Sequence, residues 1–221
     1  MAYGDGMKKL SPCGSALVLD MLREAFKDGD APRAALDAGC GRGERLRDCA
    51  AAWPGAALFG IDADAENAAA ARENCPGAEI VTGDVCALPW ADGSFDAAVC
   101  ECTLSLLDAP ERCLSELARV LRPGGVLLLG DLCTDAETPR LRIADAGAVR
   151  YLASRAWHER AAETAGFVIR KYRDCREDYL TMAAQMIFDG EACCLGPGAL
   201  GALRQWKAGY GMWLLEKGAI G

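Results

Sequence analysis

The chain has 221 residues, of which 52% are hydrophobic and 25% are charged, and its formal net charge is −8. That length supports one sizeable hydrophobic core, and the absence of any run of about 18 apolar residues argues against a membrane-spanning helix. The acidic balance argues against a nucleic-acid backbone as partner, because phosphate binding needs clustered lysine and arginine. We therefore expect a single domain over residues 1–221 that acts on a small molecule and binds neither nucleic acid nor membrane.

Twelve cysteines are many for this length. The first ten residues lack the basic-then-apolar pattern of an export signal, so we expect a cytoplasmic protein with free thiols. No Cys-x-x-Cys occurs, so the sequence predicts no metal site. Most of the cysteines lie in apolar runs, where a free thiol packs as a small hydrophobe. The pairs Cys100 with Cys102 and Cys193 with Cys194 are the two that invite a functional interpretation.

The first predicted element is a helix over residues 12–28, ahead of any strand. Ser11 supplies an N-cap, and Pro12 suits the first helical position, where its missing N–H leaves no bond unmade. The polar residues 27–30 end the helix. This helix either covers one face of a sheet or closes over a bound ligand.

The segment 34–43 is the most informative part of the sequence. A short apolar strand ends at Asp37 and is followed by three glycines spaced two apart and by a predicted helix. Glycine tolerates positive φ and has no side chain, so such a turn can lie against a ligand that also meets the free N–H groups of the helix. The dinucleotide fingerprint needs its third glycine where this chain has Glu44, which disfavours a nicotinamide cofactor.

Acidic residues also end the next three predicted strands. The strand over 57–61 ends at Asp62, the strand over 79–81 runs into Asp84, and a later strand ends at Glu101. An acid at the end of the second strand can accept both hydroxyls of a ribose. Since the carboxyl ends of parallel strands lie at one edge of a sheet, we expect these acids to cluster in space.

A fifth strand over 126–129 follows a predicted helix and a tight turn. The helix has Asp108 as its candidate N-cap, with Glu111 three residues on, and an inward stripe of leucines at positions 114, 117 and 121. In the turn, Pro123 followed by Gly124 suits the central positions of a type II turn. Strands and helices alternate from residue 12 to residue 170, which predicts an α/β fold with a doubly wound, mostly parallel sheet.

Taken together, these motifs resemble the class I S-adenosylmethionine (SAM)-dependent methyltransferases, of the methyltransferase-11-like, small-molecule type. The resemblance rests on Asp-x-Gly-x-Gly-x-Gly at 37–43, on the acids after the following strands and on Arg-Val-Leu-Arg-Pro-Gly-Gly at 119–125, and it covers about residues 34–170. It implies a Rossmann-like sheet of seven strands with an antiparallel last strand, SAM as the cofactor and a SAM-binding core over residues 34–130.

The resemblance also implies roles for individual residues. The glycine turn would lie beneath the methionine part of SAM, with Asp37 orienting the turn and accepting from the ammonium group through water. Asp62 would accept the ribose hydroxyls, and Asp84 would accept from the exocyclic amine of adenine. The implied cofactor-binding set is Asp37, Ala38, Gly39, Cys40, Gly41, Gly43, Asp62, Ala63, Asp84, Val85, Cys100 and Glu101.

Methyl transfer from a sulfonium needs in-line positioning, and it needs a general base only when the nucleophile carries a proton. Glu101 is the candidate catalytic residue, as a base or as the binding group for a cationic substrate, and Cys102 beside it is the second candidate. The single histidine, His158, is an alternative base, although a helix histidine beside a tryptophan is usually structural. Arg42 either pairs with the cofactor carboxylate or is an exposed arginine at a helix start.

Residues 100–107 loosely resemble the stretch of arsenite methyltransferases that carries one arsenic-binding thiol. Such a substrate needs two or three converging thiolates. The region that carries a second thiol in that family corresponds to residues 147–157, which contain no cysteine, so Cys133 or the Cys193-Cys194 pair would have to replace it. We expect Cys102 to face the site alone, and a thiophilic metalloid stays an alternative substrate.

The C-terminal part departs from the family pattern. Residues 131–160 are assigned to the substrate side, with no strand expected before Phe167 and a helix over 157–164 that Ser154 caps and Gly166 ends. A helical insert over 174–209 separates the last two strands, which are predicted over 167–172 and 210–215. The insert is a lid over the substrate, a packed helix hairpin or the contact surface of a homodimer; its apolar stripe consists of Tyr179, Met182, Ala183 and Met186.

Three functions stay open on the sequence: methyl transfer to a small molecule, SAM binding without catalysis, and nicotinamide-dependent oxidoreduction. A ligand that binds only the native state raises the melting temperature, so SAM and NAD would separate the third function from the first two.

Overall fold

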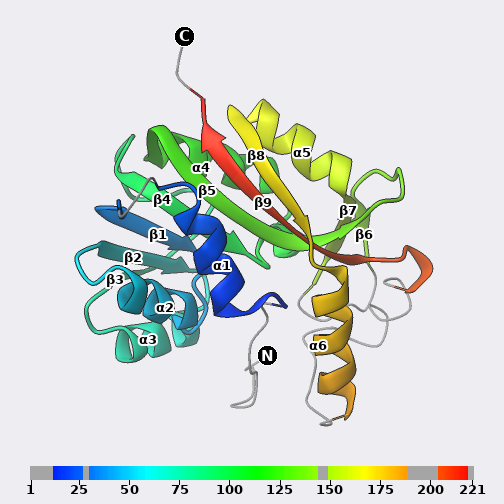
Figure 1. Ribbon diagram of the computed structural model, residues 1–221, viewed down its shortest axis with the longest axis horizontal. Helices are drawn as coiled ribbons and strands as arrows, with labels where there is room; N and C mark the ends of the chain where they lie inside the picture. Colours follow the sequence, from blue (N-terminus) through cyan, green and yellow to red (C-terminus); the bar gives the residue numbers. More distant parts are fainter. Residues whose placement is uncertain (1–11, 27–29, 144–148, 189–203, 219–221) are drawn as a thin grey trace.

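The computed structural model describes residues 12–26, 30–143, 149–188 and 204–218 (Figure 1). Its helices are α1 (Gly14–Arg23), α2 (Glu44–Ala52), α3 (Ala65–Asn74), α4 (Pro110–Val120), α5 (Arg155–Thr164) and α6 (Arg176–Phe188). Its strands are β1 (Ala34–Ala38), β2 (Ala57–Asp62), β3 (Glu79–Thr82), β4 (Phe95–Glu101), β5 (Leu121–Thr134), β6 (Leu141–Arg142), β7 (Tyr151–Ser154), β8 (Phe167–Asp174) and β9 (Gly209–Lys217). Within these residues, no helix combines the length and the apolar character needed to cross a membrane.

The strands form one sheet in which β3, β2, β1, β4 and β5 lie side by side and parallel. Strand β9 runs antiparallel between β5 and β8. The chain winds outward from β1 to β3 and then returns to the other side of β1 with β4, which places a switch point between β1 and β4. Ligands of doubly wound sheets bind at the carboxyl ends of the strands at such a point. The predicted α/β sheet with an antiparallel last strand is confirmed.

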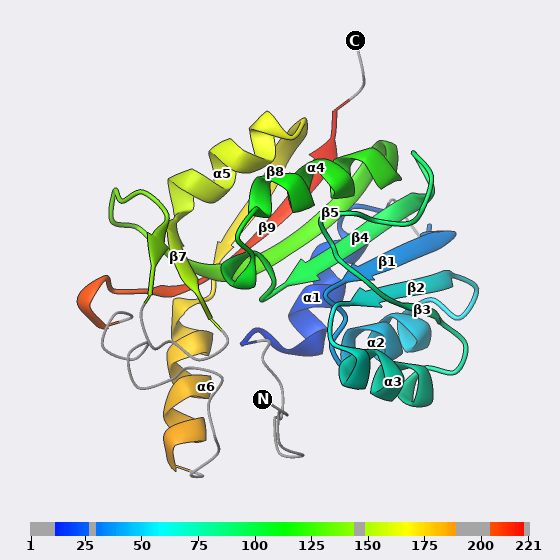
Figure 2. The same cartoon turned by 180° about the vertical axis from the view of Figure 1, so that it is seen from behind.

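Helices cover both faces of the sheet, as Figures 1 and 2 show from opposite sides. Helices α1, α2 and α3 pack in the core on one face, and α4 and α5 pack on the other. Successive strand residues point to opposite faces, so Ala35 packs on the α1–α3 side while Leu36 and Ala38 pack on the α4–α5 side. Asp37, between the last two, therefore points toward α2.

Two predicted helix starts are wrong. Helix α1 begins at Gly14 rather than at Pro12, with Cys13 in the capping position and no side-chain cap, and it ends at Arg23; residues 11 and 27–29, predicted to bound it, lie outside the described part. Helix α4 begins at Pro110 after Ala109. The predicted cap, Asp108, instead accepts a hydrogen bond of 2.7 Å from the Tyr151 hydroxyl, because β7 brings that residue beside it.

The predicted leucine stripe of α4 is confirmed at two of its three positions. Leu114 and Leu117 are fully buried, and burying a leucine side chain contributes about 1.5–3 kcal/mol. Leu121 is equally buried, but it is the first residue of β5 and pairs with Phe95 across the sheet.

The region between β5 and β8 contains more strand than the sequence predicts. Strand β5 continues to Thr134, β7 pairs with its end in parallel, and the two-residue β6 pairs with β7, so the expectation of no strand before Phe167 is wrong. These pieces are too short to show an alternating pattern, and pairing with an existing edge stabilises them. The predicted cap of the following helix is confirmed, since the Ser154 hydroxyl accepts from the Trp157 N–H at 3.1 Å.

The predicted helical insert is present as α6, which extends away from the sheet edge (Figures 1 and 2). Strands β8 and β9 pair with each other although the insert separates them in sequence. In α6, Tyr179 is buried and Met182 packs partly against the core, while Leu180 and Phe188 are exposed. The Met186 side chain, Cys193, Cys194 and the Gly196-Pro197-Gly198 segment lie outside the described part of the chain.

Candidate functional site

The glycine turn after β1 is left-handed at each of its three glycines, with φ of +82° at Gly39, +51° at Gly41 and +82° at Gly43. A Cβ on Gly39 would lie 2.3 Å from the Thr103 hydroxyl oxygen, which bonds the Glu101 carbonyl at 2.9 Å. A Cβ on Gly41 would meet no atom within 4 Å. Gly39 thus allows β1 and β4 to approach each other, whereas Gly41 leaves an open face on the turn.

Asp62, at the end of β2, holds the turn in place. One of its carboxylate oxygens accepts from the Gly41 N–H at 2.8 Å, and the other accepts from the Asp64 N–H at 2.9 Å. The Gly39 and Cys40 N–H groups donate to the Ile61 carbonyl at 2.8 and 3.0 Å. A carboxylate offers about four acceptor sites, so Asp62 keeps capacity for hydroxyl donors beside the open face of the turn.

Asp37 carries an unsatisfied acceptor beneath the turn. The residue is 5% exposed, and its Oδ2 is buried without a hydrogen-bond partner among the described residues. Burial raises the pKa of Asp37 to about 7, against the opposing effect of the Arg45 guanidinium. Since a buried acceptor left unbonded costs about 1–3 kcal/mol, this atom marks a place where a ligand with a donor would be stabilised.

Arg45, in the first turn of α2, is one of two site residues that the sequence did not indicate; Tyr210 is the other. The Arg45 Nε donates to Glu101 Oε2 at 2.7 Å, and its Nη1 donates to Asp48 Oδ2 at 3.1 Å. The Arg45 and Glu101 side chains are only 11% and 10% exposed, so the pair is largely desolvated. No pattern in the sequence links them, because α2 and β4 meet only in the folded chain.

Glu101, Cys102 and Tyr210 come together at the end of β4. The Tyr210 hydroxyl donates to Glu101 Oε1 at 3.4 Å and lies 3.4 Å from the Cys102 sulfur. Burial raises the pKa of Tyr210 well above its ordinary value, so the phenol is neutral and can donate. Cys102 has a φ of +51°, which is rare for a residue with a side chain. Cys100, in contrast, is fully buried on the α4 side of the sheet.

The remaining predicted cofactor residues extend the same sheet edge. Asp84 is exposed beyond β3, and its carboxylate accepts from the Cys86 N–H at 2.8 Å. Val85 is buried beneath that turn, and Ala63 is exposed after Asp62. The backbone joins these turns directly, since the Gly83 N–H donates to the Asp62 carbonyl at 2.9 Å.

Of the two other residues considered from the sequence, Arg42 lies at this edge and His158 lies on α5. Arg42 stands in the glycine turn, between its second and third glycines, and is exposed. His158 is buried on α5, where its Nδ1 lies 3.0 Å from the Ser154 carbonyl and its ring stacks on Trp213 at 5.0 Å between centroids. Burial lowers the pKa of His158, with Asp131 opposing the shift. These contacts match the structural role that the sequence analysis weighed for His158.

Within the part of the chain that the structure describes, no second thiol joins Cys102 in a group that could hold a metal ion. Among the described residues, one group of three metal-binding side chains lies within ligand distance, and it contains Cys13, Cys175 and Asp178 rather than Cys102. Cys133 is buried within β5. The Cys193-Cys194 pair lies outside the described part of the chain.

Residues 36–129 match the protein family described as "Methyltransferase domain". The chain is 36% identical over 117 residues to the demethylmenaquinone methyltransferase of Beutenbergia cavernae, an alignment that covers 48% of this chain and 49% of that protein. The chain spans about half or less of the length of the first curated relatives it matches.

Two solved structures show the same fold across nearly the whole chain. The geranyl diphosphate C-methyltransferase of Streptomyces coelicolor A3(2), crystallised with S-adenosyl-L-homocysteine, superposes with a TM-score of 0.77 at 17% identity, covering 92% of this chain and 79% of that one. The [4+2]-cyclase SpnF superposes with a TM-score of 0.75 at 21% identity, covering 99% and 89% of the two chains. The [4+2]-cyclase shows that this fold also occurs in a protein named for a reaction other than methyl transfer.

Proposed function

We propose that this chain transfers the methyl group of SAM to a small molecule, because residues 36–129 match a methyltransferase domain. The relatives are named for several different substrates, so the substrate is not carried over from any of them. The acidic chain, with its formal net charge of −8, supports a small-molecule substrate over a nucleic acid.

The single observation that carries the proposal is the buried Oδ2 of Asp37, which has no hydrogen-bond partner within the described part of the chain and precedes a turn whose Gly41 has an open face. The cofactor of this class, SAM, carries an ammonium group that could donate to that oxygen. Its ribose hydroxyls would donate to Asp62, and its adenine amine to Asp84, which follow the neighbouring strands. The side-chain chemistry at this edge therefore fits SAM, since each acidic group would meet a donor.

Bound SAM supplies a methyl group on a sulfonium, which needs alignment with the nucleophile more than activation. In our proposal Glu101 faces that methyl group, with its carboxylate held by the Arg45 guanidinium at 2.7 Å and by the Tyr210 hydroxyl at 3.4 Å. Glu101 then accepts the proton of a hydroxyl or amine nucleophile, or it binds a cationic substrate. Cys102 lines the same end, and in this proposal residues 131–143 and 149–160 lie on the substrate side.

Thermal denaturation in the presence of SAM, S-adenosylhomocysteine or NAD tests the cofactor assignment. We expect the first two to raise the melting temperature and NAD to leave it unchanged. Incubation with methyl-labelled SAM and a metabolite library then tests the reaction, with the Glu101→Gln variant as the control for background transfer. Stabilisation by NAD instead of SAM would overturn the proposal.

Two narrower alternatives follow from specific observations. The fold also occurs in a protein named as a [4+2]-cyclase, so SAM binding without methyl transfer stays an alternative, and the label experiment separates it from catalysis. Arsenite as the substrate has less support, since the three-residue group of Cys13, Cys175 and Asp178 excludes Cys102, the thiol on which the loose resemblance to arsenite methyltransferases rests. A labelled product that appears only with arsenite would promote it.

A further inference from the structure

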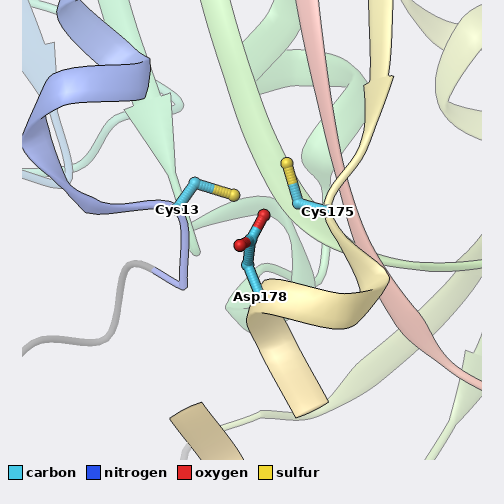
Figure 3. Close-up of side chains that lie close together, drawn as sticks. All are labelled: Cys13, Cys175 and Asp178. Carbon is cyan, nitrogen blue, oxygen red and sulfur yellow. The ribbon is translucent and has the colours of Figure 1, made fainter. Parts of the chain in front are cut away.

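Two cysteines and an aspartate converge outside the residues assigned to SAM. Cys13 precedes α1, Cys175 lies between β8 and α6, and Asp178 lies in the first turn of α6. One ligand atom from each, the two sulfurs and a carboxylate oxygen, lies within 4.8 Å of the other two. Figure 3 shows the Cys13 side chain on one side and those of Cys175 and Asp178 on the other, gathered around one point. We call these three residues the thiol–carboxylate group.

We propose that the thiol–carboxylate group binds a thiophilic divalent cation, Zn²⁺, with one coordination position left open to water. Zinc favours tetrahedral sites of cysteine sulfur, histidine nitrogen and carboxylate oxygen, and open sites use three protein ligands and a water. With Zn–S of about 2.3 Å and Zn–O of about 2.0 Å, tetrahedral ligands lie roughly 3.5–3.8 Å apart. The observed group fits that span with side-chain adjustments of about an ångström or less.

The backbone holds two of the three ligands on one rigid element. The Cys175 N–H donates to the Tyr210 carbonyl at 2.8 Å, and the Cys175 carbonyl accepts from the Tyr179 N–H at 2.9 Å as the first bond of α6. Asp178 follows Cys175 by three residues, a spacing that puts both side chains on the same side of the helix start. Two ligands are therefore preorganised, which lowers the entropy lost when a cation binds.

The third ligand comes from a different part of the fold. Cys13 is anchored by α1, whose Val18, Met21 and Leu22 are buried in the core on the α1–α3 face. A cation held by all three side chains would join the start of α1 to the start of α6. Because α6 otherwise extends away from the sheet edge (Figures 1 and 2), this joint would fix the angle at which it projects.

Burial and charge also suit a divalent cation. Cys13 is 8% and Cys175 1% exposed, so their sulfurs are shielded from water, while Asp178 is exposed and gives a cation access. Two thiolates and a carboxylate carry three negative charges, so the complex with Zn²⁺ would have a net charge of −1. The metal itself favours the thiolate form, since a coordinated thiol is deprotonated. The protons released on binding make the affinity fall as the pH falls.

Zinc titration of the reduced full-length chain against a chromophoric chelator tests the proposal. We expect one tight equivalent in the wild type, an affinity at least about 100-fold lower in Cys13→Ser and in Cys175→Ser, and about tenfold lower in Asp178→Asn. Cys133→Ala is the matched thiol control, because it also leaves eleven of the twelve cysteines. Glu177→Gln is the matched acid control, because that exposed acid adjoins Asp178 in the same helical turn.

Cobalt substitution of the wild type supplies a second measurement that does not depend on any variant folding. Co²⁺ should show intense visible bands of a tetrahedral ion and a thiolate-to-metal charge-transfer band. At a free Zn²⁺ concentration 100 times the dissociation constant, the melting temperature should rise by about 5–10 °C in the wild type and in both controls, but not in Cys175→Ser. No tight equivalent in the wild type, or equal affinity in the Cys13, Cys175 and control variants, would overturn the site, and neither result depends on SAM binding.

Discussion

The two halves of this molecule build their sites in different ways. From β1 to β4, the proposed cofactor residues follow the ends of successive parallel strands, and their contacts are largely with nearby backbone, as when Asp62 accepts from the Gly41 N–H. From β5 to β9, the contacts join side chains from distant segments, such as Tyr210 with Glu101 or Cys175 with Cys13. A site made by strand order is visible in a sequence, whereas a site made by side-chain packing is not.

The Arg45–Glu101 ion pair lies where the two halves meet. Arg45 belongs to the helix that follows the glycine turn, while the Tyr210 hydroxyl reaches Glu101 from β9, the last strand. We therefore expect substitutions in the half from β1 to β4 to lower the affinity for SAM. Substitutions in the Arg45–Glu101 ion pair, where the two halves meet, should instead lower the turnover rate. The following predictions test that division.

The largest expected effect on affinity is that of Gly41→Val. A β-branched side chain at a φ of +51° is strained and would occupy the open face of the turn, so SAM binding should fall below detection while the chain stays folded. Gly55→Val is the matched control, because its Cβ would also meet no atom within 4 Å, at an exposed turn outside the site. Full thermal stabilisation of a folded Gly41→Val variant by SAM would show that the turn is not the cofactor site.

Glu101→Gln should lower kcat by about 100-fold while the SAM dissociation constant changes by less than about threefold. The substitution keeps the shape and removes the charge, and general bases contribute at least that much to rate. Single-turnover kinetics and calorimetry measure the two quantities separately. Equal losses in kcat and in SAM affinity would show that Glu101 acts in cofactor binding and not in the chemical step.

Asp62→Ala should weaken SAM binding at least tenfold. The variant loses the acceptor proposed for two ribose hydroxyls and also the bond that holds the Gly41 N–H, and bonds to a charged group contribute about 1.5–3 kcal/mol each. Calorimetry should find the SAM affinity of Glu66→Ala unchanged, since that exposed acid lies in the first turn of the neighbouring helix α3. An unchanged affinity in Asp62→Ala would remove the ribose assignment.

The smallest effect is a pH dependence of SAM affinity. Burial raises the pKa of Asp37 to about 7, so in the ligand-free protein its carboxyl is mostly protonated at pH 6. An ammonium donor needs the ionised form, and affinity should therefore fall about five- to tenfold between pH 7.5 and pH 6. Asp37→Asn should bind more weakly and show a flat profile over the same range. A wild-type affinity that rises toward pH 6 would contradict the assignment.

Much of the fold follows from local patterns in the sequence. Apolar runs that end in acids mark β1, β2 and β4, and the Ser154 cap marks the start of α5, because these signals depend on residues close together in the chain. The short strands β6 and β7 were missed because their stability comes from the edge of β5. The cap predicted at Asp108 failed for a similar reason, since Tyr151 binds that carboxylate.

The sequence by itself determined the glycine turn and the row of acids after β1 to β4, because parallel strands bring their carboxyl ends to one edge whatever the side chains do. Only the tertiary structure decided that Arg45 pairs with Glu101, that Asp37 has a buried oxygen with no partner among the described residues, and that Cys13 lies close to Cys175. Those arrangements depend on how helices pack across the sheet and how α6 leaves it, and such contacts have no fixed spacing along the chain.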